Sequence, residues 1–144
     1  MTVFLDSSAL VKRYVDESAS SDVRGIRAPM VASALAQVEV PSAFWGKTRS
    51  AGLSPVHAQV ASAAFAHDCG RSRGPYAFVA LGVEVLALAR RLVARHPLRA
   101  ADAIQLASAV VTRRTVGDCS FGCFDRRLNG AAVAEGFMLA FPDR

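Results

Sequence analysis

Four carboxylates lie in apolar stretches of this sequence, where a charged side chain is costly. They are Asp6, Glu39, Asp102 and Asp125. A buried ionised carboxylate is strongly unfavourable unless it is paired or binds a metal ion, so four of them in one small domain suggest a common cause. A shared divalent cation is such a cause. Because all of these ligands are oxygen atoms, they favour Mg²⁺ or Mn²⁺ over zinc.

A cation of this kind, bound by carboxylates, suits the hydrolysis of phosphodiester bonds. It orients a water molecule, lowers the pKa of that water and neutralises charge on a phosphoryl oxygen. A glycosidase uses a pair of carboxylates without a metal ion, and four acids exceed what that chemistry needs. The residue types therefore favour metal-dependent phosphodiester hydrolysis.

Each carboxylate also has a simpler explanation. Asp6 and Asp125 directly follow predicted strands, where they can cap the next helix, and Asp102 can complement the dipole at the start of its helix. Glu39 is harder to explain in this way. We expect it beyond the first turn of its helix, among apolar neighbours, where a charged residue is seldom buried without a partner.

The composition indicates one globular domain with a basic surface. The chain has 144 residues, of which 52% are hydrophobic and 20% charged, and we expect a single domain over residues 1–144. Its formal net charge is +5. If four of the twelve acidic residues lie inside, the surface is more basic than this total. That favours a polyanionic partner such as nucleic acid, and an acidic protein fits equally well.

The cysteines and the hydropathy pattern indicate in which cellular compartment the protein is found. The three cysteines are odd in number and include no C-x-x-C pair, which is typical of a reducing, cytoplasmic environment. The N-terminus shows no signal-peptide pattern, and no apolar run is long enough to cross a bilayer. We therefore expect a soluble cytoplasmic protein with no membrane partner.

The elements that must position the acids alternate between strand and helix. Hydrophobic runs and capping residues predict strands at 2–5, 29–32, 76–81, 121–124 and 137–141, and helices at 7–14, after Ser33, and at 54–70, 83–95, 99–113 and 126–135. This alternation predicts an α/β fold with a short parallel sheet covered on both faces. Sites in such folds form at the carboxyl ends of the strands. Asp6, Asp102 and Asp125 should face one crevice there, with Glu39 reaching it from its helix.

Four segments of the chain, in order, resemble a known family. They are Phe4–Lys12 (FLDSSALVK), Glu39–Ala43 (EVPSA), Leu98–Ala107 (LRAADAIQLA) and Phe124–Leu128 (FDRRL). Together they resemble the four signature blocks of PIN-domain ribonucleases, and most closely those of the VapC toxins of type II toxin–antitoxin systems. The resemblance spans almost the whole chain.

The resemblance implies a three-layer α/β/α fold and Mg²⁺- or Mn²⁺-dependent endoribonuclease activity on an RNA substrate. It also implies a homodimer and inhibition by a cognate VapB-type antitoxin. Carried over by position, Asp6 and Asp102 match the main metal-binding aspartates, and Glu39 and Asp125 match the other acidic catalytic residues. Ser8 matches a small hydroxyl residue that supports the site.

The chain departs from the family pattern at Cys123, where Ser or Thr is common two residues before the last aspartate. A thiol is a weaker hydrogen-bond donor than a hydroxyl, so we expect weaker support of Asp125 at this position. For contacts with RNA phosphates, the blocks offer Lys12, Arg13, Arg99, Arg126 and Arg127.

Two other functions are compatible with parts of the pattern. The first is phosphoryl transfer through an aspartyl intermediate on Asp6, which usually needs a second acid two residues later, where this chain has Ser8. The second is a non-catalytic nucleic-acid-binding or protein-binding module that retains the PIN fold. The presence of all four acids counts against such a decayed site.

Overall fold

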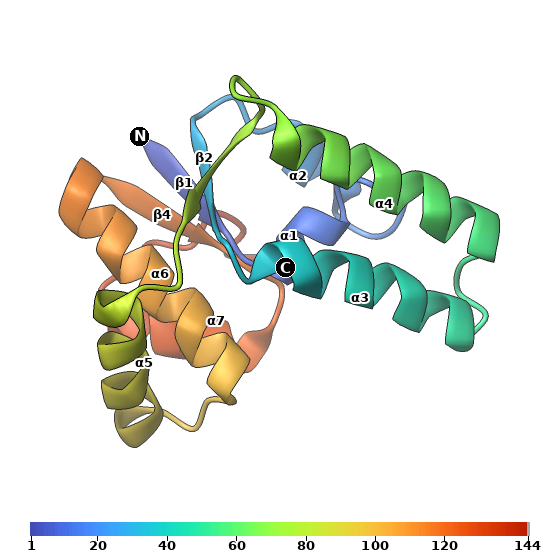
Figure 1. Ribbon diagram of the computed structural model, residues 1–144. Coiled ribbons are helices and arrows are strands. Elements are labelled where there is room, and N and C mark those ends of the chain that lie inside the picture. The colour runs from blue at the N-terminus through green and yellow to red at the C-terminus, as the bar shows by residue number, and fades with distance from the viewer. Residues whose placement is uncertain (144) are drawn as a thin grey trace.

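A computed structural model describes residues 1–143 as a four-stranded sheet with helices on both faces (Figure 1). The strands are β1 (Thr2–Leu5), β2 (Met30–Ser33), β3 (Tyr76–Val79) and β4 (Cys119–Gly122). All the pairings are parallel, and the strand order is β3-β2-β1-β4. The predicted three-layer α/β/α fold is confirmed; Arg144, the last residue of the predicted domain, lies outside the described residues.

The helices divide between the two faces of the sheet. Helices α5 (Val83–Arg95), α6 (Ala100–Val116) and α7 (Arg126–Ala134) pack on one face. On the other lie α1 (Ser7–Val11), α2 (Ser20–Arg24), α3 (Ala36–Arg49) and α4 (Pro55–Gly70). Helices α3 and α4 lie side by side and extend away from the sheet (Figure 1). Among residues 1–143, no helix has both the length and the hydropathy needed to cross a bilayer.

The side chains of β1 alternate between the hydrophobic cores on the two faces of the sheet. Val3 and Leu5 pack with α1, α3 and α4, whereas Phe4 packs on the other face with α5 and α6. Phe4 also stacks on Phe121 of β4, with ring centroids 5.8 Å apart. Successive residues of a strand point to opposite faces, so the apolar run of β1 fills both cores. This fixes the position of Asp6, which directly follows β1.

Strong local signals predicted some elements correctly. Helix α4 begins after Ser54, whose Oγ accepts a hydrogen bond from the His57 backbone N–H at 3.2 Å, and Pro55 occupies its first turn. Helix α5 has the predicted bounds. Val85, Leu88, Ala89 and Leu92 form its buried face, whereas Leu86 and Val93 are each 44% exposed.

Other elements correct the sequence-based expectations. The helix after Asp6 ends at Val11 rather than at Tyr14. Ser33 ends β2 instead of capping α3, and its Oγ accepts a hydrogen bond from the Leu35 backbone N–H. Only Tyr76 of β3 is buried, because this strand is at an edge of the sheet. The predicted strand 137–141 is reduced to a single parallel bridge between Leu139 and Phe121.

Gly122 is the last residue of β4, shortly before Asp125. The side chains packed around it leave no room for a Cβ. A Cβ at this position would lie 2.6 Å from Leu5 Cδ2 and 3.1 Å from Phe141 Cε2. We expect Gly122→Ala to lower the free energy of unfolding by about 1–3 kcal/mol, measured by urea denaturation. Gly130→Ala is the matched control, because nothing lies within 4 Å of its Cβ position in α7 and the helix should gain about 0.5–1 kcal/mol. Equal stability of Gly122→Ala and the wild type would contradict this packing.

Candidate active site

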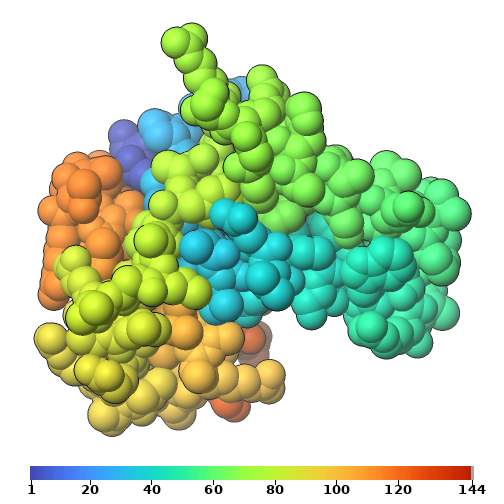
Figure 2. Space-filling model, viewed as in Figure 1, coloured from blue at the N-terminus to red at the C-terminus, as the bar shows by residue number. Residues whose placement is uncertain are grey.

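The four predicted site residues come from the elements that meet at the carboxyl edge of the sheet. Asp6 follows the central strand β1, and Asp125 comes shortly after its neighbour β4. Glu39 lies in the first turn of α3 and Asp102 in the first turn of α6. Figure 2 shows the surface hollowed between α3, in teal, and the start of α6, in gold. The sequence analysis placed Glu39 beyond its first turn, and the later start of α3 corrects this.

Asp6 is the most buried of the four carboxylates, with 5% of its surface exposed. Its Oδ1 accepts hydrogen bonds from Ser8 Oγ at 2.7 Å and from the Ala9 backbone N–H at 3.2 Å, so Asp6 caps α1, as its simpler explanation proposed. Its Oδ2 accepts a bond from Cys123 Sγ at 3.3 Å. Burial, with a smaller contribution from Glu39, raises the pKa of Asp6 to about 6. The capping role is therefore present, but the fold also holds this carboxylate where its charge is unfavourable.

Ser8 and Cys123 join the ends of β1 and β4. Ser8 Oγ donates to Asp6 and accepts a hydrogen bond from the Phe124 backbone N–H at 2.9 Å. Cys123 Sγ donates to Asp6 and accepts from the Asp125 backbone N–H at 3.2 Å. Burial and the nearby Asp6 raise the pKa of the Cys123 thiol, which keeps it protonated as a donor. The sequence predicts weaker support of Asp125 from this thiol; in the structure the thiol donates to the Asp6 carboxylate and contacts Asp125 through its backbone.

Glu39 is half-buried and held by two residues to which the sequence analysis assigned no role. Its Oε1 accepts hydrogen bonds from Ser7 Oγ at 2.8 Å and from Gln105 Nε2 at 2.6 Å. Gln105 lies three residues after Asp102 in α6, a spacing that puts both side chains on the same side of a helix. That spacing is the sequence signal that could have identified Gln105.

Asp102 and Asp125 complete the acidic site from α6 and α7. No hydrogen bond or ion pair from any residue between 1 and 143 is found at the half-buried carboxylate of Asp102. Its partial burial, and then the charges of Asp125 and Glu39, raise the pKa of Asp102, while Arg99 and Arg127 oppose the rise. Asp125 is exposed, and its Oδ1 caps α7 by accepting from the Leu128 backbone N–H at 2.9 Å.

The structure thus makes the four carboxylates electrostatic neighbours. Glu39 acts on both Asp6 and Asp102, and Asp125 acts on Asp102. Like charges repel one another, so these neighbours disfavour the ionisation of Asp6 and Asp102. Clusters of carboxylates with raised pKa values are typical of functional sites, although structural networks also produce them.

The donor set fits one type of metal site and not another. Within residues 1–143, no three His, Cys, Asp or Glu side chains lie close enough together to hold a metal ion. A closed cage of four carboxylates around one ion therefore does not fit. Mg²⁺, however, usually keeps several waters and binds only one or two protein carboxylates together with substrate phosphates. The oxygen-only donors and their mutual repulsion fit an open site of that type.

The basic residues proposed for phosphate contact differ in their availability. Lys12 Nζ is bound to Glu17 Oε1 at 3.2 Å and to the Ser18 carbonyl at 2.8 Å. Arg13 donates to the Tyr76 hydroxyl and to the Val23 carbonyl. Arg99 and Arg127 are exposed and act electrostatically on Asp102, and Arg126, which precedes Arg127 in the sequence, is also exposed. The structure therefore favours Arg99, the N-cap residue of α6, and Arg126 and Arg127 of α7 over Lys12 and Arg13.

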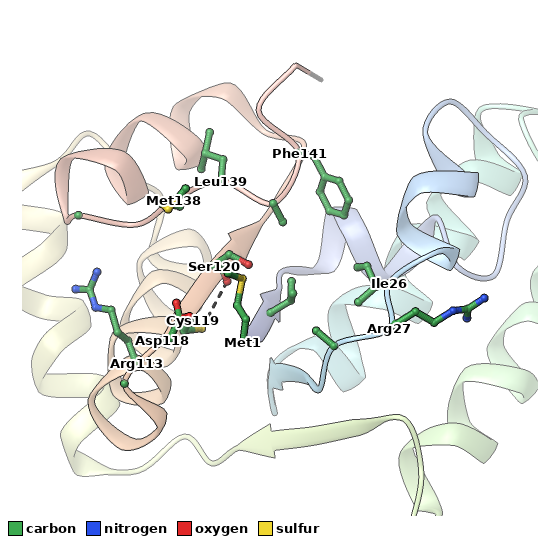
Figure 3. A pocket seen from close by; sticks show the side chains of 15 residues that line it. Met1, Ile26, Arg27, Arg113, Asp118, Cys119, Ser120, Met138, Leu139 and Phe141 are labelled. Atoms are coloured by element: carbon green, nitrogen blue, oxygen red, sulfur yellow. Dashed lines mark hydrogen bonds between the residues drawn. The ribbon is translucent and has the colours of Figure 1, made fainter.

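A cavity of about 610 Å³ lies away from the acids, near the amino ends of β1 and β4 (Figure 3). Asp118 is the one acidic residue among those that line it. The guanidinium groups of Arg27 and Arg113 lie at opposite ends of this cavity in Figure 3 and do not converge. Without convergent polar groups, this cavity is a weaker candidate site than the acidic cluster.

Comparisons with protein-family models and with curated proteins found no match to this sequence. The functional assignment therefore depends on the site geometry and on the four sequence blocks.

Proposed function

We propose that this protein is the toxin of a type II toxin–antitoxin system, a Mg²⁺- or Mn²⁺-dependent endoribonuclease of the PIN-domain type. The observation that supports this most is the cluster of four carboxylates at the carboxyl edge of the sheet, with the pKa values of Asp6 and Asp102 both raised. The cluster weakens the fold unless a cation binds there, so a functional role explains it better than four independent caps.

In this proposal each side chain has a defined task. Asp6 and Asp102 hold the ion, Glu39 and Asp125 add negative charge beside it, and Ser8 and Cys123 keep Asp6 in place. A bound Mg²⁺ or Mn²⁺ supplies water activation and neutralises charge on the scissile phosphate. Arg99 and Arg127 attract the RNA backbone to the rim of the site.

Incubation of purified protein with a pool of end-labelled RNAs tests this proposal. We expect cleavage in Mn²⁺ or Mg²⁺ and none in EDTA. The new ends should lack 2′,3′-cyclic phosphates, because water rather than the 2′-hydroxyl is the attacking group. RNA that is bound but stays intact with every metal ion would contradict the proposal and would favour a non-catalytic binding module. The absence of three converging metal ligands among residues 1–143 also favours that alternative.

The partners and the compartment belong to the same proposal. The toxin acts in the cytoplasm as a homodimer, and a VapB-type antitoxin inhibits it. The antitoxin segment that covers the site carries a basic residue that lies among the carboxylates, because a guanidinium binds carboxylates well in a poorly solvated setting.

If a basic residue of the antitoxin occupies the metal position, antitoxin and metal should compete. We expect saturating Mn²⁺ to weaken antitoxin binding at least about tenfold, a change of about 1.4 kcal/mol, measured by calorimetry on the purified pair. Sodium chloride of equal ionic strength is the control for general screening. An antitoxin affinity that Mn²⁺ leaves unchanged would contradict direct occlusion of the site.

A further inference from the structure

Helix α5 has apolar residues on two faces. One face is buried in the core, and the other carries Val83, Leu86, Arg90 and Val93, which we call the α5 stripe. Val83 is 87% exposed, and Leu86 and Val93 are each 44% exposed. Spacings of three, four and three residues place these side chains along one face of a helix. In Figure 2 the yellow atoms of α5, at the lower left, lie at the surface. Single exposed apolar residues are ordinary, but an aligned set is typical of an interaction surface.

A groove of about 330 Å³ lies between the α5 stripe and the start of α6. Arg90 is the only charged residue among the described residues that line it. The rest of the lining is apolar and comes from both helices: Leu86, Ala89, Val93, Ala100, Ala103 and Ile104. A recess with this lining suits an apolar side chain of a protein partner.

The same surface therefore has both a projecting side chain and a recess that fits it. Val83 projects at the start of α5, and the groove is lined by Val93, ten residues later, about 15 Å along the helix. The stripe is symmetric about Leu88, because Val83 and Val93 are each five residues from it, and Leu86 and Arg90 are each two residues from it. Two copies of α5 packed antiparallel about this point place Val83 of each copy at the groove of the other.

The charges beside the α5 stripe fit the same arrangement. Glu84 and Arg91 are seven residues apart, about two helical turns, and so lie on the same side of α5. In the antiparallel pair, Glu84 of one copy lies beside Arg91 of the other, and this contact occurs twice. Within residues 1–143, Arg91 has no ion pair, and Glu84 has only a loose one, 3.7 Å from Arg114, between two exposed side chains. Both charges are therefore available to a second copy.

We propose that the α5 stripe and its groove form the surface on which two copies of this chain associate, by antiparallel packing of α5 on α5. An interface about a two-fold axis uses the same patch on both copies and must be complementary to itself. This patch meets that condition in shape and in charge. The aliphatic stem of Arg90 packs on Leu86 of the other copy while its guanidinium stays in water. The inference rests on the homodimer of the proposed function but not on its chemistry.

Val83→Glu tests this surface, with sedimentation velocity of the purified full chain over a concentration series as the measurement. The wild type should form a dimer, and Val83→Glu should raise the dimer dissociation constant at least about tenfold, because it places a charge in an apolar groove. An acid in the first turn of a helix is favourable, so the fold should persist. Val56→Glu is the matched control, because Val56 is 68% exposed in the first turn of α4, and its dissociation constant should equal that of the wild type.

Reversing the charges tests the pairing independently of the groove. Arg91→Glu should weaken the dimer about threefold or more, and combining it with Glu84→Arg should restore the dimer. A double variant that stays as weak as Arg91→Glu would contradict the antiparallel arrangement.

The outcome for the wild type separates this inference from the proposed function. If the wild type is a dimer and Val83→Glu has the same dissociation constant, the α5 surface is wrong while the homodimer stands. A wild type that is monomeric at every concentration would overturn the homodimer and this inference together. Cleavage of RNA by the same preparation is a separate measurement, and its failure would leave the dimer surface intact.

Discussion

Replacing Asp6 with Asn should abolish RNA cleavage and, in metal-free buffer at pH 7, should raise the free energy of unfolding by about 2–3 kcal/mol. Burial raises the pKa of Asp6 from 3.8 to about 6, so the folded state disfavours the ionised carboxylate by that amount. Asn is as good a helix cap as Asp, which preserves the bond from the Ala9 backbone N–H. The same change that removes a metal ligand therefore relieves electrostatic strain.

The pH dependence of this gain has a definite sign. Because the pKa of Asp6 is raised in the folded state, the wild type becomes less stable as the pH rises from about 4 to about 6, through the titration of this group. The advantage of Asp6→Asn should be absent below about pH 4 and complete above about pH 6. Urea denaturation at pH 4 and pH 7, in EDTA, measures both ends. Asp118→Asn, at an exposed position near the amino end of β4, is the control for the change in net charge. An Asp6→Asn variant that is less stable than the wild type at pH 7 would contradict the account.

Mn²⁺ should stabilise the folded wild type, and the gain should shrink in Glu39→Gln. An ion that binds only the native state adds about 2.7 kcal/mol at a hundred times its Kd. Removing the charge of Glu39 weakens the attraction for the cation while the side chain keeps an acceptor for Ser7 and Gln105. Thermal unfolding across a Mn²⁺ series measures the difference.

The control for the metal prediction is Glu84→Gln, an exposed acid in the first turn of α5. It should retain the full Mn²⁺ stabilisation of the wild type. Equal stabilisation of the wild type and Glu39→Gln would show that Glu39 has a structural role alone.

Much of the fold was predictable because its main elements carry local signals. Ser54 and Pro55 mark the start of α4, and strand–helix alternation predicts the parallel sheet. Helix α2 was missed because it is short and begins after Ala19, which has a left-handed backbone (φ 67°) and no capping side chain. The predicted strand 137–141 has the apolar composition of a strand, but its backbone makes only a single bridge with β4, between Leu139 and Phe121.

The site was predictable to a different extent for each residue. The shared edge of Asp6 and Asp125 was predictable because the carboxyl ends of neighbouring parallel strands meet there, although β4 ends at Gly122 and not directly before Asp125. The roles of Ser7 and Gln105 could not be predicted, because Gln105 bonds to Glu39, 66 residues away in the chain, only after α6 and α3 have taken their places. The same holds for the Cys123 thiol, which bonds to Asp6, 117 residues away.

The most direct test of the central claim is the rate of cleavage of one RNA substrate in Mn²⁺ by the wild type, Asp6→Asn and Asp102→Asn, purified in the same way. The account predicts cleavage by the wild type that stops on addition of EDTA, and no cleavage above the buffer background by either folded variant. Cleavage by either variant at the wild-type rate, or a wild-type rate that EDTA leaves unchanged, would contradict it.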